Sequence, residues 1–378
     1  MIKTVLFDVD GVLLSEERYF DASALTVWEI LYSKNYLGLN PEKFKTDYSD
    51  SEIDEIRARV FEHDLVLKFQ KSCGLNANWD MIYLTVAYQI IRLLEQVKDS
   101  KQVAQWVSNE MNRDVLLEIG AALAGKELSL DFSAFLDDFE QSERTKVGLF
   151  SHLDDLAKEK LGVEKSVFGE IGELWSTCEL VSQEWYVGDK HVFASTGRPS
   201  VQTGKKGFLS VEKVLAPAEE IASLFESLKK AGVTIGIGTG RPELETLEPF
   251  KYLEWLKHFD VNYIVTADDV LAAERNIPEA TPLSKPNPFT YVKALSGKTK
   301  TDQECIEEEM PIPNGKETLI VGDSFADLLA ARKMGCTFAA VLTGLSGKDA
   351  RADFEKHNAE YILDSVLDVK DLVLSLVK

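Results

Sequence analysis

The first predicted strand of this chain is separated from all the others by a long helical block, and this separation constrains the fold most. A short apolar run at Thr4–Asp8, followed by Gly11, is typical of a buried strand in a parallel sheet. Over residues 16–211 the apolar residues instead recur with helical spacing. After that block, short apolar runs alternate with helical segments, the pattern of a parallel α/β sheet. We therefore expect one discontinuous α/β domain, residues 1–15 and 212–378, interrupted by a mostly α-helical domain, residues 16–211.

The same periodicities predict the individual elements. In the α/β domain, strands are predicted at residues 4–8, 233–240, 261–266, 317–323, 337–343 and 359–365. Helices are predicted in that domain at residues 216–232, 242–259, 324–335 and 366–378. In the inserted domain, helical patterns cover residues 51–72, 79–100 and 164–186.

The composition excludes several classes of partner. With 63 acidic and 42 basic residues, the formal net charge is -21, so nucleic acids and anionic membrane surfaces are repelled. No apolar run approaches the length of a membrane-spanning helix, and the N-terminal segment lacks the pattern of a secretory signal. The four cysteines lie far apart, which predicts reduced thiols rather than disulfides or a zinc site. These features predict a cytoplasmic protein that binds neither nucleic acid nor membranes.

Two carboxylates at the end of the first strand are the first candidates for chemistry. Asp8 and Asp10 are two residues apart, so their side chains leave an extended chain on the same side. In open α/β sheets, ligands bind at the carboxyl ends of the strands. Two carboxylates this close repel each other unless a cation or a shared proton intervenes, and both arrangements serve phosphoryl transfer. A turn that only closes the strand would use the same residue types.

Thr239 and Gly240 follow the second predicted strand, in the segment IGIGTGRP, just before a helix that Pro242 is suited to open. A hydroxyl and a backbone amide near a helix N-terminus can bind an anion. A plain glycine turn would have the same composition. A similar segment at Ser195–Ser200, STGRPS, does not follow a convincing strand, and we expect it to be a surface loop or a structural part of the inserted domain.

Two later segments carry further candidates. Lys285, in LSKPNP, lies in a rigid segment bounded by prolines and could neutralise a nucleophilic carboxylate and a phosphoryl group, although a single lysine is usually only solvated. Asp323 ends another strand, in VGDSFADLLAA, and Asp327 lies about one helical turn further on. Such carboxylates are hard oxygen ligands that suit Mg²⁺. Asp323 or Ser324 could instead cap the helix that follows.

Taken together, DVDGV, GTGRP, SKPNP and VGDSFAD resemble the four motifs of the haloacid dehalogenase superfamily, in the family's order and strand placement. The resemblance covers the α/β domain, nearly half of the chain. It implies a Rossmann-like parallel sheet core of the haloacid dehalogenase type with a large, mostly α-helical inserted cap domain. Insertion between the first and second motifs is similar to the phosphoglycolate phosphatases and β-phosphoglucomutases, whose caps are much smaller.

The resemblance also implies the catalytic roles. Asp8 would attack phosphorus and form an aspartyl-phosphate, and Asp10 would protonate the leaving oxygen and then activate water. Thr239, the Gly240 amide and Lys285 would bind the phosphoryl oxygens.

The cofactor implied by the resemblance is Mg²⁺. Its ligands would be the carboxylate of Asp8, the backbone carbonyl of Asp10 and the carboxylate of Asp323. Asp327 would act through a water molecule or from behind the direct ligands.

The function implied is that of a Mg²⁺-dependent phosphatase that hydrolyses a small-molecule phosphomonoester, because dehalogenases and phosphonatases of this family lack an acid at the position of Asp10. Two alternatives stay open: a phosphotransferase or phosphomutase of the β-phosphoglucomutase type, and a non-catalytic binding or regulatory protein. The large inserted domain could also form a homodimer. Side chains near its first linker are candidate substrate contacts or exposed linker residues: Glu16, Arg18, Tyr19 and Phe20.

Overall fold

The computed structural model describes residues 1–75 and 77–376, and the chain divides into two compact units. Unit 1 consists of Met1–Glu16 and Leu209–Lys378, and unit 2 consists of Glu17–Phe208. The predicted domain boundaries lie close to these junctions. An α/β unit is therefore interrupted by a helical one between its first and second strands.

Unit 1 is built on a six-stranded parallel sheet with the strand order β3-β2-β1-β4-β5-β6. The strands are β1 Thr4–Phe7, β2 Thr234–Gly238, β3 Ile264–Val265, β4 Thr318–Gly322, β5 Thr337–Val341 and β6 Tyr361–Leu363. Each predicted strand is present, and the α/β fold class is confirmed. In the centre of the sheet, Phe7 is in register with Ile237 of β2 and Val321 of β4, so these three strands end at one edge.

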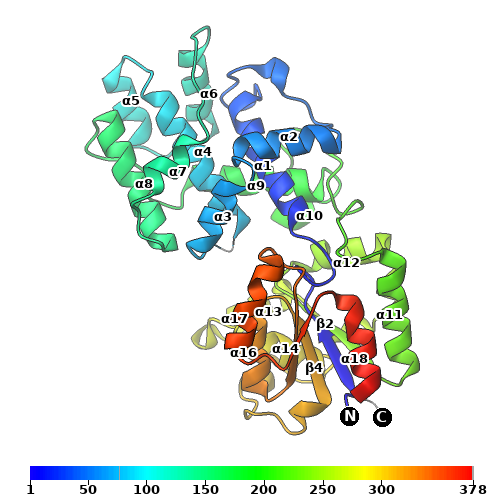
Figure 1. Cartoon of the computed structure of the whole chain (residues 1–378). Helices are drawn as coiled ribbons and strands as arrows, with labels where there is room; N and C mark the ends of the chain where they lie inside the picture. Colours follow the sequence, from blue (N-terminus) through cyan, green and yellow to red (C-terminus); the bar gives the residue numbers. More distant parts are fainter. Residues whose placement is uncertain (76, 377–378) are drawn as a thin grey trace. The chain divides into compact units, whose positions relative to one another are not determined.

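Helices cover both faces of this sheet (Figure 1). One apolar core forms between the sheet and α11 Ala218–Lys230, α12 Glu243–Tyr252 and α18 Val369–Leu376. The other core forms on the opposite face with α13 Ala267–Asn276, α14 Phe289–Leu295, α15 Asp302–Ile306, α16 Phe325–Met334 and α17 Arg351–Lys356. The central strands are buried because both of their faces are covered, as expected for a parallel sheet.

Two predicted helices of unit 1 differ at their ends. The helix predicted at residues 242–259 stops at Tyr252, because Glu254 has a positive φ of 57° that an α-helix cannot contain, and only a short 3-10 turn follows. In the segment predicted at residues 366–378, α18 begins at Val369, and residues 377–378 lie outside the described part of the chain.

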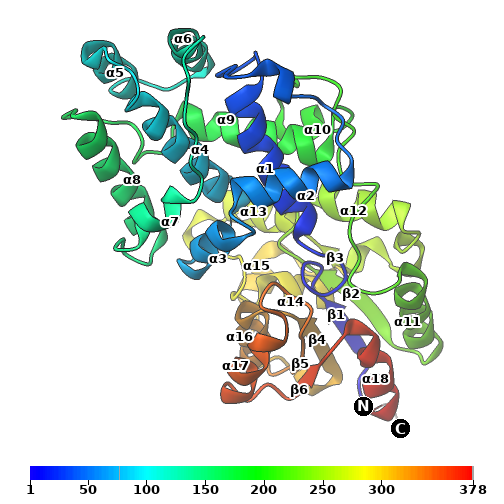
Figure 2. The ribbon, with the colours of Figure 1, turned by 45° about the horizontal axis from the view of Figure 1, so that its top comes forward.

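Unit 2 is helical throughout its regular elements (Figure 2). Its helices are α1 Glu17–Tyr32, α2 Asp50–Val60, α3 Leu65–Ser72, α4 Asn78–Leu94, α5 Ser100–Val107, α6 Arg113–Leu123, α7 Ala134–Phe139, α8 Lys146–Leu161, α9 Glu173–Val187 and α10 Val192–Thr196. The predicted helix at residues 51–72 is two helices, because Glu62, His63 and Asp64 all have positive φ. Of the segment predicted at residues 164–186, only the part from Glu173 onward is helical.

The chain leaves and re-enters unit 1 at one place. The amide of Ser15 donates to the carbonyl of Lys213 at 2.8 Å, and the amide of Leu215 donates to the carbonyl of Leu13 at 3.2 Å. Between these two bonds, Leu14 and Val214 form an antiparallel bridge. We call this pair of segments, residues 13–15 and 213–215, the paired linkers.

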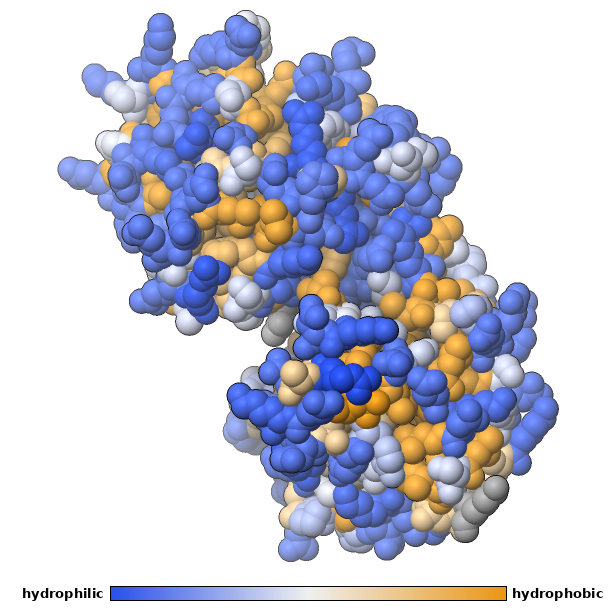
Figure 3. Space-filling view, in the orientation of Figure 1, coloured by the Kyte–Doolittle hydropathy of each residue, from blue (hydrophilic) through white to orange (hydrophobic). Residues whose placement is uncertain are grey.

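Hydrophilic side chains cover most of the surface that Figure 3 shows, with separate apolar patches on each unit. This distribution agrees with the large negative net charge of the sequence. Within residues 1–75 and 77–376, no helix combines the length and the apolar character needed to cross a bilayer.

Phe225 of α11 tests the first of the two cores. Its fully buried ring meets the edges or faces of Phe7, Trp255 and Phe259 at centroid distances of 5.7, 6.0 and 4.9 Å. We expect Phe225→Ala to lower the free energy of unfolding by about 3–5 kcal/mol, because the cavity cannot collapse in so crowded an aromatic cluster. Urea denaturation measures this change. Tyr252→Ala, at a side chain that is 51% exposed, should change stability by less than about 0.5 kcal/mol, and equal effects would contradict the assignment of this core.

Candidate active site

Asp8 directly follows β1 at the carboxyl edge of the sheet and is largely buried. Its Oδ1 accepts a hydrogen bond from the amide of Val9 at 2.7 Å, and its Oδ2 pairs with Nζ of Lys285 at 2.8 Å. Both oxygens are therefore held in place. A carboxylate with fixed oxygens and a cation beside one of them is well arranged for nucleophilic attack.

Asp323 and Asp327 meet Asp8 at this edge. Asp323 directly follows β4, the neighbour of β1, and Asp327 is in the first turn of α16. One carboxylate oxygen from each of the three residues lies within 4.8 Å of the others. The structure thus brings together three of the four predicted metal ligands by their side chains.

Asp327 is occupied by protein donors. Its Oδ1 accepts from the hydroxyl of Tyr291 at 2.7 Å and from Lys285 at 2.8 Å, and its Oδ2 accepts from the hydroxyl of Ser324 at 2.6 Å. Ser324 also caps α16 by accepting from the amide of Asp327. The capping interpretation is therefore confirmed for Ser324, and the interpretation of Asp323 and Asp327 as metal ligands stays a prediction.

Lys285 bridges two of these carboxylates, since its Nζ lies 2.8 Å from Asp8 and 2.8 Å from Asp327. It also donates to the carbonyl of Gly238, the last residue of β2, at 3.3 Å. Tyr291 packs close to Gly238, where a Cβ would lie 2.6 Å from its ring, so the glycine makes room for the tyrosine. Lys285 is therefore not a solvated surface lysine.

The electrostatics of the cluster favour protons or a cation. Burial raises the pKa of Asp8 to about 7, with a further rise from the charge of Asp327 and an opposing effect of Lys285. Burial, with repulsion from Asp8 and Asp327, raises the pKa of Asp323 well above its ordinary value. Three carboxylates around one lysine leave an excess of negative charge. The donor set fits a hard divalent cation such as Mg²⁺, which would be held by Asp8 and Asp323.

Two glycines enclose the carboxylate of Asp323. A Cβ on Gly11 would lie 2.1 Å from Oδ2 of Asp323, and a Cβ on Gly344 would lie 2.0 Å from the same atom. The two loops are joined where the hydroxyl of Thr343 donates to the carbonyl of Gly11 at 2.6 Å. Any larger residue at either glycine would displace the carboxylate.

Asp10 lies in the same loop but makes a different contact. Its Oδ1 accepts from Nε of Arg241 at 2.7 Å, while its side chain is 31% exposed. Burial raises the pKa of Asp10 above its ordinary value, and the charge of Arg241 opposes that rise. The carboxylate of Asp10 thus stands outside the group formed by Asp8, Asp323 and Asp327.

Thr239 and Gly240 directly follow β2, which lies next to β1, the strand that Asp8 follows. Thr239 is buried, and its hydroxyl oxygen accepts from the amide of Arg241 at 3.1 Å. Gly240 is exposed, and the space where a Cβ would lie is open. Pro242 precedes α12 rather than lying in its first turn.

Several other candidate residues belong to unit 2 and have their contacts there. Arg18 is buried in ion pairs with Asp21 and Asp50, and Phe20 is buried, so the interpretation of these two as exposed linker side chains is wrong. In the Ser195–Ser200 segment, Arg198 pairs with Glu179 of α9, which is a contact within unit 2.

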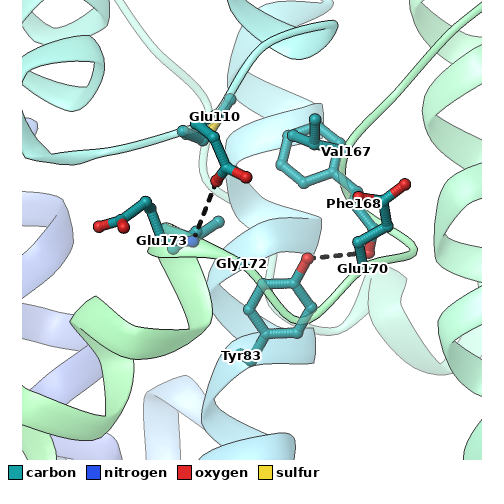
Figure 4. A pocket seen from close by; sticks show the side chains of 9 residues that line it. Tyr83, Glu110, Val167, Phe168, Glu170, Gly172 and Glu173 are labelled. Carbon is teal, nitrogen blue, oxygen red and sulfur yellow. Dashed lines mark hydrogen bonds between the residues drawn. The ribbon is translucent and has the colours of Figure 1, made fainter.

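A small pocket in unit 2, with Tyr83, Glu110 and Phe168 in its wall, is shown in Figure 4. The hydroxyl of Tyr83 donates to the carbonyl of Phe168 at 2.9 Å, and Glu110 accepts from the amide of Glu173 at 3.2 Å. Its cavity of about 10 Å³ has room for roughly one water molecule. Because this pocket is small and these polar groups have hydrogen-bond partners, it is a weaker candidate for a functional site than the carboxylate cluster in unit 1.

Sequence reasoning missed Tyr291, Arg241 and Gly344. Tyr291 and Arg241 lie in or next to the predicted motifs, in SKPNPFTY and GTGRP. The burial of their polar side chains identifies them as candidate site residues, and burial is seen only once the fold is known. Gly344 follows the fifth strand in a segment without a recognised motif.

Comparisons with known proteins agree with this geometry. The family model described as HAD-hydrolase-like matches residues 282–369, which include Lys285, Asp323 and Asp327. The curated pyrophosphatases PpaX of Bacillus mycoides (strain KBAB4) and of Halalkalibacterium halodurans are 28% identical over 158 residues and 26% identical over 162 residues. These regions cover 42% and 43% of this chain, and only 60% and 62% of the two relatives.

One solved structure matches the chain along its length. It is a crystal structure from the Northeast Structural Genomics Consortium with 38% sequence identity and a TM-score of 0.93. The match covers 99% of each chain, so it includes the helical insertion as well as the sheet.

The excess of carboxylates predicts a pH-dependent stability in the presence of a chelator. Because the folded-state pKa of Asp8 is about 7 and that of Asp323 is also raised, the folded protein binds protons more tightly than the unfolded chain. The resulting stabilisation is complete below the ordinary aspartate pKa near 3.8 and is lost as the pH rises through about 7. Chemical denaturation should therefore show falling stability over that range, and Asp323→Asn should recover part of the loss.

Asp364→Asn is the matched control, since Asp364 is 66% exposed and pairs with Arg351 at the surface. It should leave the pH dependence unchanged. If both substitutions altered stability equally at low and at high pH, mutual repulsion in the cluster would be refuted.

Proposed function

Because this chain belongs to the haloacid dehalogenase superfamily of hydrolases, we propose that it is a Mg²⁺-dependent phosphatase that hydrolyses a small-molecule phosphomonoester through an aspartyl-phosphate on Asp8. The observation that carries the proposal is the placement of Asp8: buried, paired with Lys285 at 2.8 Å, and grouped with Asp323 and Asp327 at the carboxyl edge of the sheet.

The first step is transfer of the phosphoryl group to Asp8. A carboxylate oxygen of Asp8 forms a bond to phosphorus as the bond from phosphorus to the leaving oxygen breaks, and Asp10 gives its proton to that oxygen. Lys285 favours the ionised form of Asp8 and attracts the phosphoryl oxygens. The hydroxyl of Thr239 and the amide of Gly240 are neutral donors on the adjacent strand end for the same oxygens.

The second step releases inorganic phosphate. Asp10, now ionised, takes a proton from a water molecule whose oxygen attacks phosphorus, and the bond between phosphorus and Asp8 breaks. The free carboxylate of Asp8 returns to its contacts with the Val9 amide and Lys285.

Asp8 and Asp323 are the side chains that would hold Mg²⁺. Asp327 accepts a hydrogen bond from Lys285 and so holds the lysine in place. A bound Mg²⁺ supplies positive charge that offsets the carboxylates and the phosphoryl oxygens. The raised pKa values of Asp8 and Asp323 are what such a donor set shows before a cation is bound.

Asp8→Asn tests the nucleophile. The amide keeps the size of the side chain but cannot form an acyl phosphate, so we expect almost complete loss of phosphate release with the fold retained. Release of inorganic phosphate should be measured on sugar phosphates, phosphoglycolate, nucleotides and p-nitrophenyl phosphate, with Mg²⁺ or a chelator. Pyrophosphate belongs in the panel because the two curated relatives are pyrophosphatases.

The controls for this experiment separate the alternatives. Wild-type activity in Asp8→Asn would rule out the nucleophile assignment. Appearance of a new phosphorylated sugar instead of free phosphate would favour a phosphomutase, and folded wild-type protein inactive on the whole panel would favour a non-catalytic role.

Gly344→Ala tests the metal site without relying on activity. Its methyl group would lie 2.0 Å from Oδ2 of Asp323 and should displace that carboxylate, so we expect Mg²⁺ binding to weaken by about 10- to 100-fold in isothermal titration calorimetry. Gly232→Ala is the control: it strains a residue at φ +79° but has open space around its Cβ. Unchanged Mg²⁺ affinity in Gly344→Ala would contradict the role of Asp323.

A further inference from the structure

Arg241 is a buried cation that the phosphatase mechanism leaves without a role. Its side chain is 1% exposed, although guanidinium groups are rarely buried unless they are paired. It follows Gly240, in the loop proposed to bind the phosphoryl group. Its partners therefore indicate what it does.

One partner is Asp10, the proposed acid and base. Nε of Arg241 donates to Oδ1 of Asp10 at 2.7 Å, across 231 positions of sequence. In the part of the chain that the structure describes, no other cationic side chain forms an ion pair with Asp10. Since the carboxylate of Asp10 is also partly exposed, its direction depends on Arg241.

Arg241 is itself held firmly. Its Nη1 donates to Oε1 of Glu212 at 2.8 Å, and both side chains of this pair are 1% exposed. The same nitrogen approaches the carbonyl of Glu245 at 3.3 Å, and the amide of Arg241 donates to the hydroxyl of Thr239 at 3.1 Å. Because a guanidinium is planar and rigid, fixing Nη1 also fixes where Nε points.

These contacts close a ring within unit 1. Glu212 directly precedes Lys213, which the paired linkers join to Ser15, and Ser15 follows Asp10 in the same loop. Asp10 is thus connected to Arg241 in two ways. One is the direct ion pair; the other runs along the backbone from Asp10 to Ser15, across the hydrogen bond to Lys213, and from the neighbouring Glu212 to Arg241. This ring of contacts fixes the position of the Asp10 carboxylate relative to the guanidinium of Arg241.

We propose that Arg241 is a positioning residue that aims Asp10 at the leaving oxygen, with Glu212 as the anchor of Arg241. The inference rests on the proposed phosphatase function and assigns specificity within it. An acid matters most when the leaving oxygen is strongly basic, as in an alkyl phosphate, and least when it is a good leaving group, as in p-nitrophenyl phosphate. Arg241 therefore extends the substrate range toward alkyl phosphates.

The test compares kcat/KM of wild type and Arg241→Met on p-nitrophenyl phosphate and on an alkyl phosphate that wild type turns over. The ratio kcat/KM reports the first step, in which the leaving group departs. We expect a loss of about 10- to 100-fold on the alkyl phosphate, part of the full worth of general acid catalysis, and a loss of less than about 3-fold on p-nitrophenyl phosphate.

A double-mutant cycle with Asp10→Asn separates positioning from a structural role. If Arg241 acts through Asp10, Arg241→Met should cost little further activity when Asp10 is already Asn. Arg351→Met, which removes a surface ion pair with Asp364, is the control and should leave both substrates unaffected. Should Arg241→Met fail to fold, Arg241→Lys keeps a cation but lacks the fork that reaches two acids, and the same preference between substrates is expected.

Equal losses on both substrates, or a full additional loss in the Asp10→Asn background, would overturn the role of Arg241. Neither result would affect the proposed phosphatase function, which fails separately if wild type releases no phosphate or if Asp8→Asn stays active.

Discussion

Three carboxylates and only one lysine lie together at the carboxyl edge of the sheet, and the surrounding strands and loops hold this imbalance of charge in place. Asp8, Asp323 and Asp327 repel one another when they are ionised, yet one oxygen of each lies within 4.8 Å of the others. Lys285 draws two of them together. The strands that precede Asp8 and Asp323 are adjacent and buried on both faces. The free energy gained by burying their apolar side chains offsets the repulsion among the carboxylates.

The surrounding contacts differ among the three carboxylates and suggest different roles for them. Asp327 has hydrogen-bond donors on both oxygens and can hardly turn away from Lys285 and Tyr291. Asp323 is instead enclosed by glycine backbone at Gly11 and Gly344, which limits its space without neutralising its charge. The negative charge that remains is therefore concentrated on Asp8 and Asp323, where a cation and a phosphoryl group are proposed to bind.

The sequence predicted the sheet and the placement of Asp8, Thr239 and Asp323 just after its strands, because both depend on local patterns. Short apolar runs mark buried strands, and the residues just after them must lie at the carboxyl edge. Arg241 and Glu212 could not be assigned in this way, since the contact of Arg241 with Asp10 spans 231 positions and has no local signal. Tyr291 was hidden for a similar reason: at helical spacing after SKPNP, a tyrosine reads as an ordinary core residue. In unit 2, apolar periodicity continues through Glu62–Asp64, where the backbone changes direction, because periodicity reports burial and not φ.

The paired linkers give the helical insertion an unexpected relation to the sheet. Its two ends are bonded to each other at Ser15 and Lys213, directly beside the loop of Asp10, before the chain enters unit 2 and after it returns. Seen from the sheet, the whole insertion is equivalent to the loop of a hairpin. The entropic cost of closing a loop grows only slowly with the length of the loop. The hydrogen bonds between the paired ends therefore depend little on the size of the segment that connects them. Evolution could thus exchange one insertion for another of a different size while every strand and the carboxylates at the edge of the sheet kept their positions.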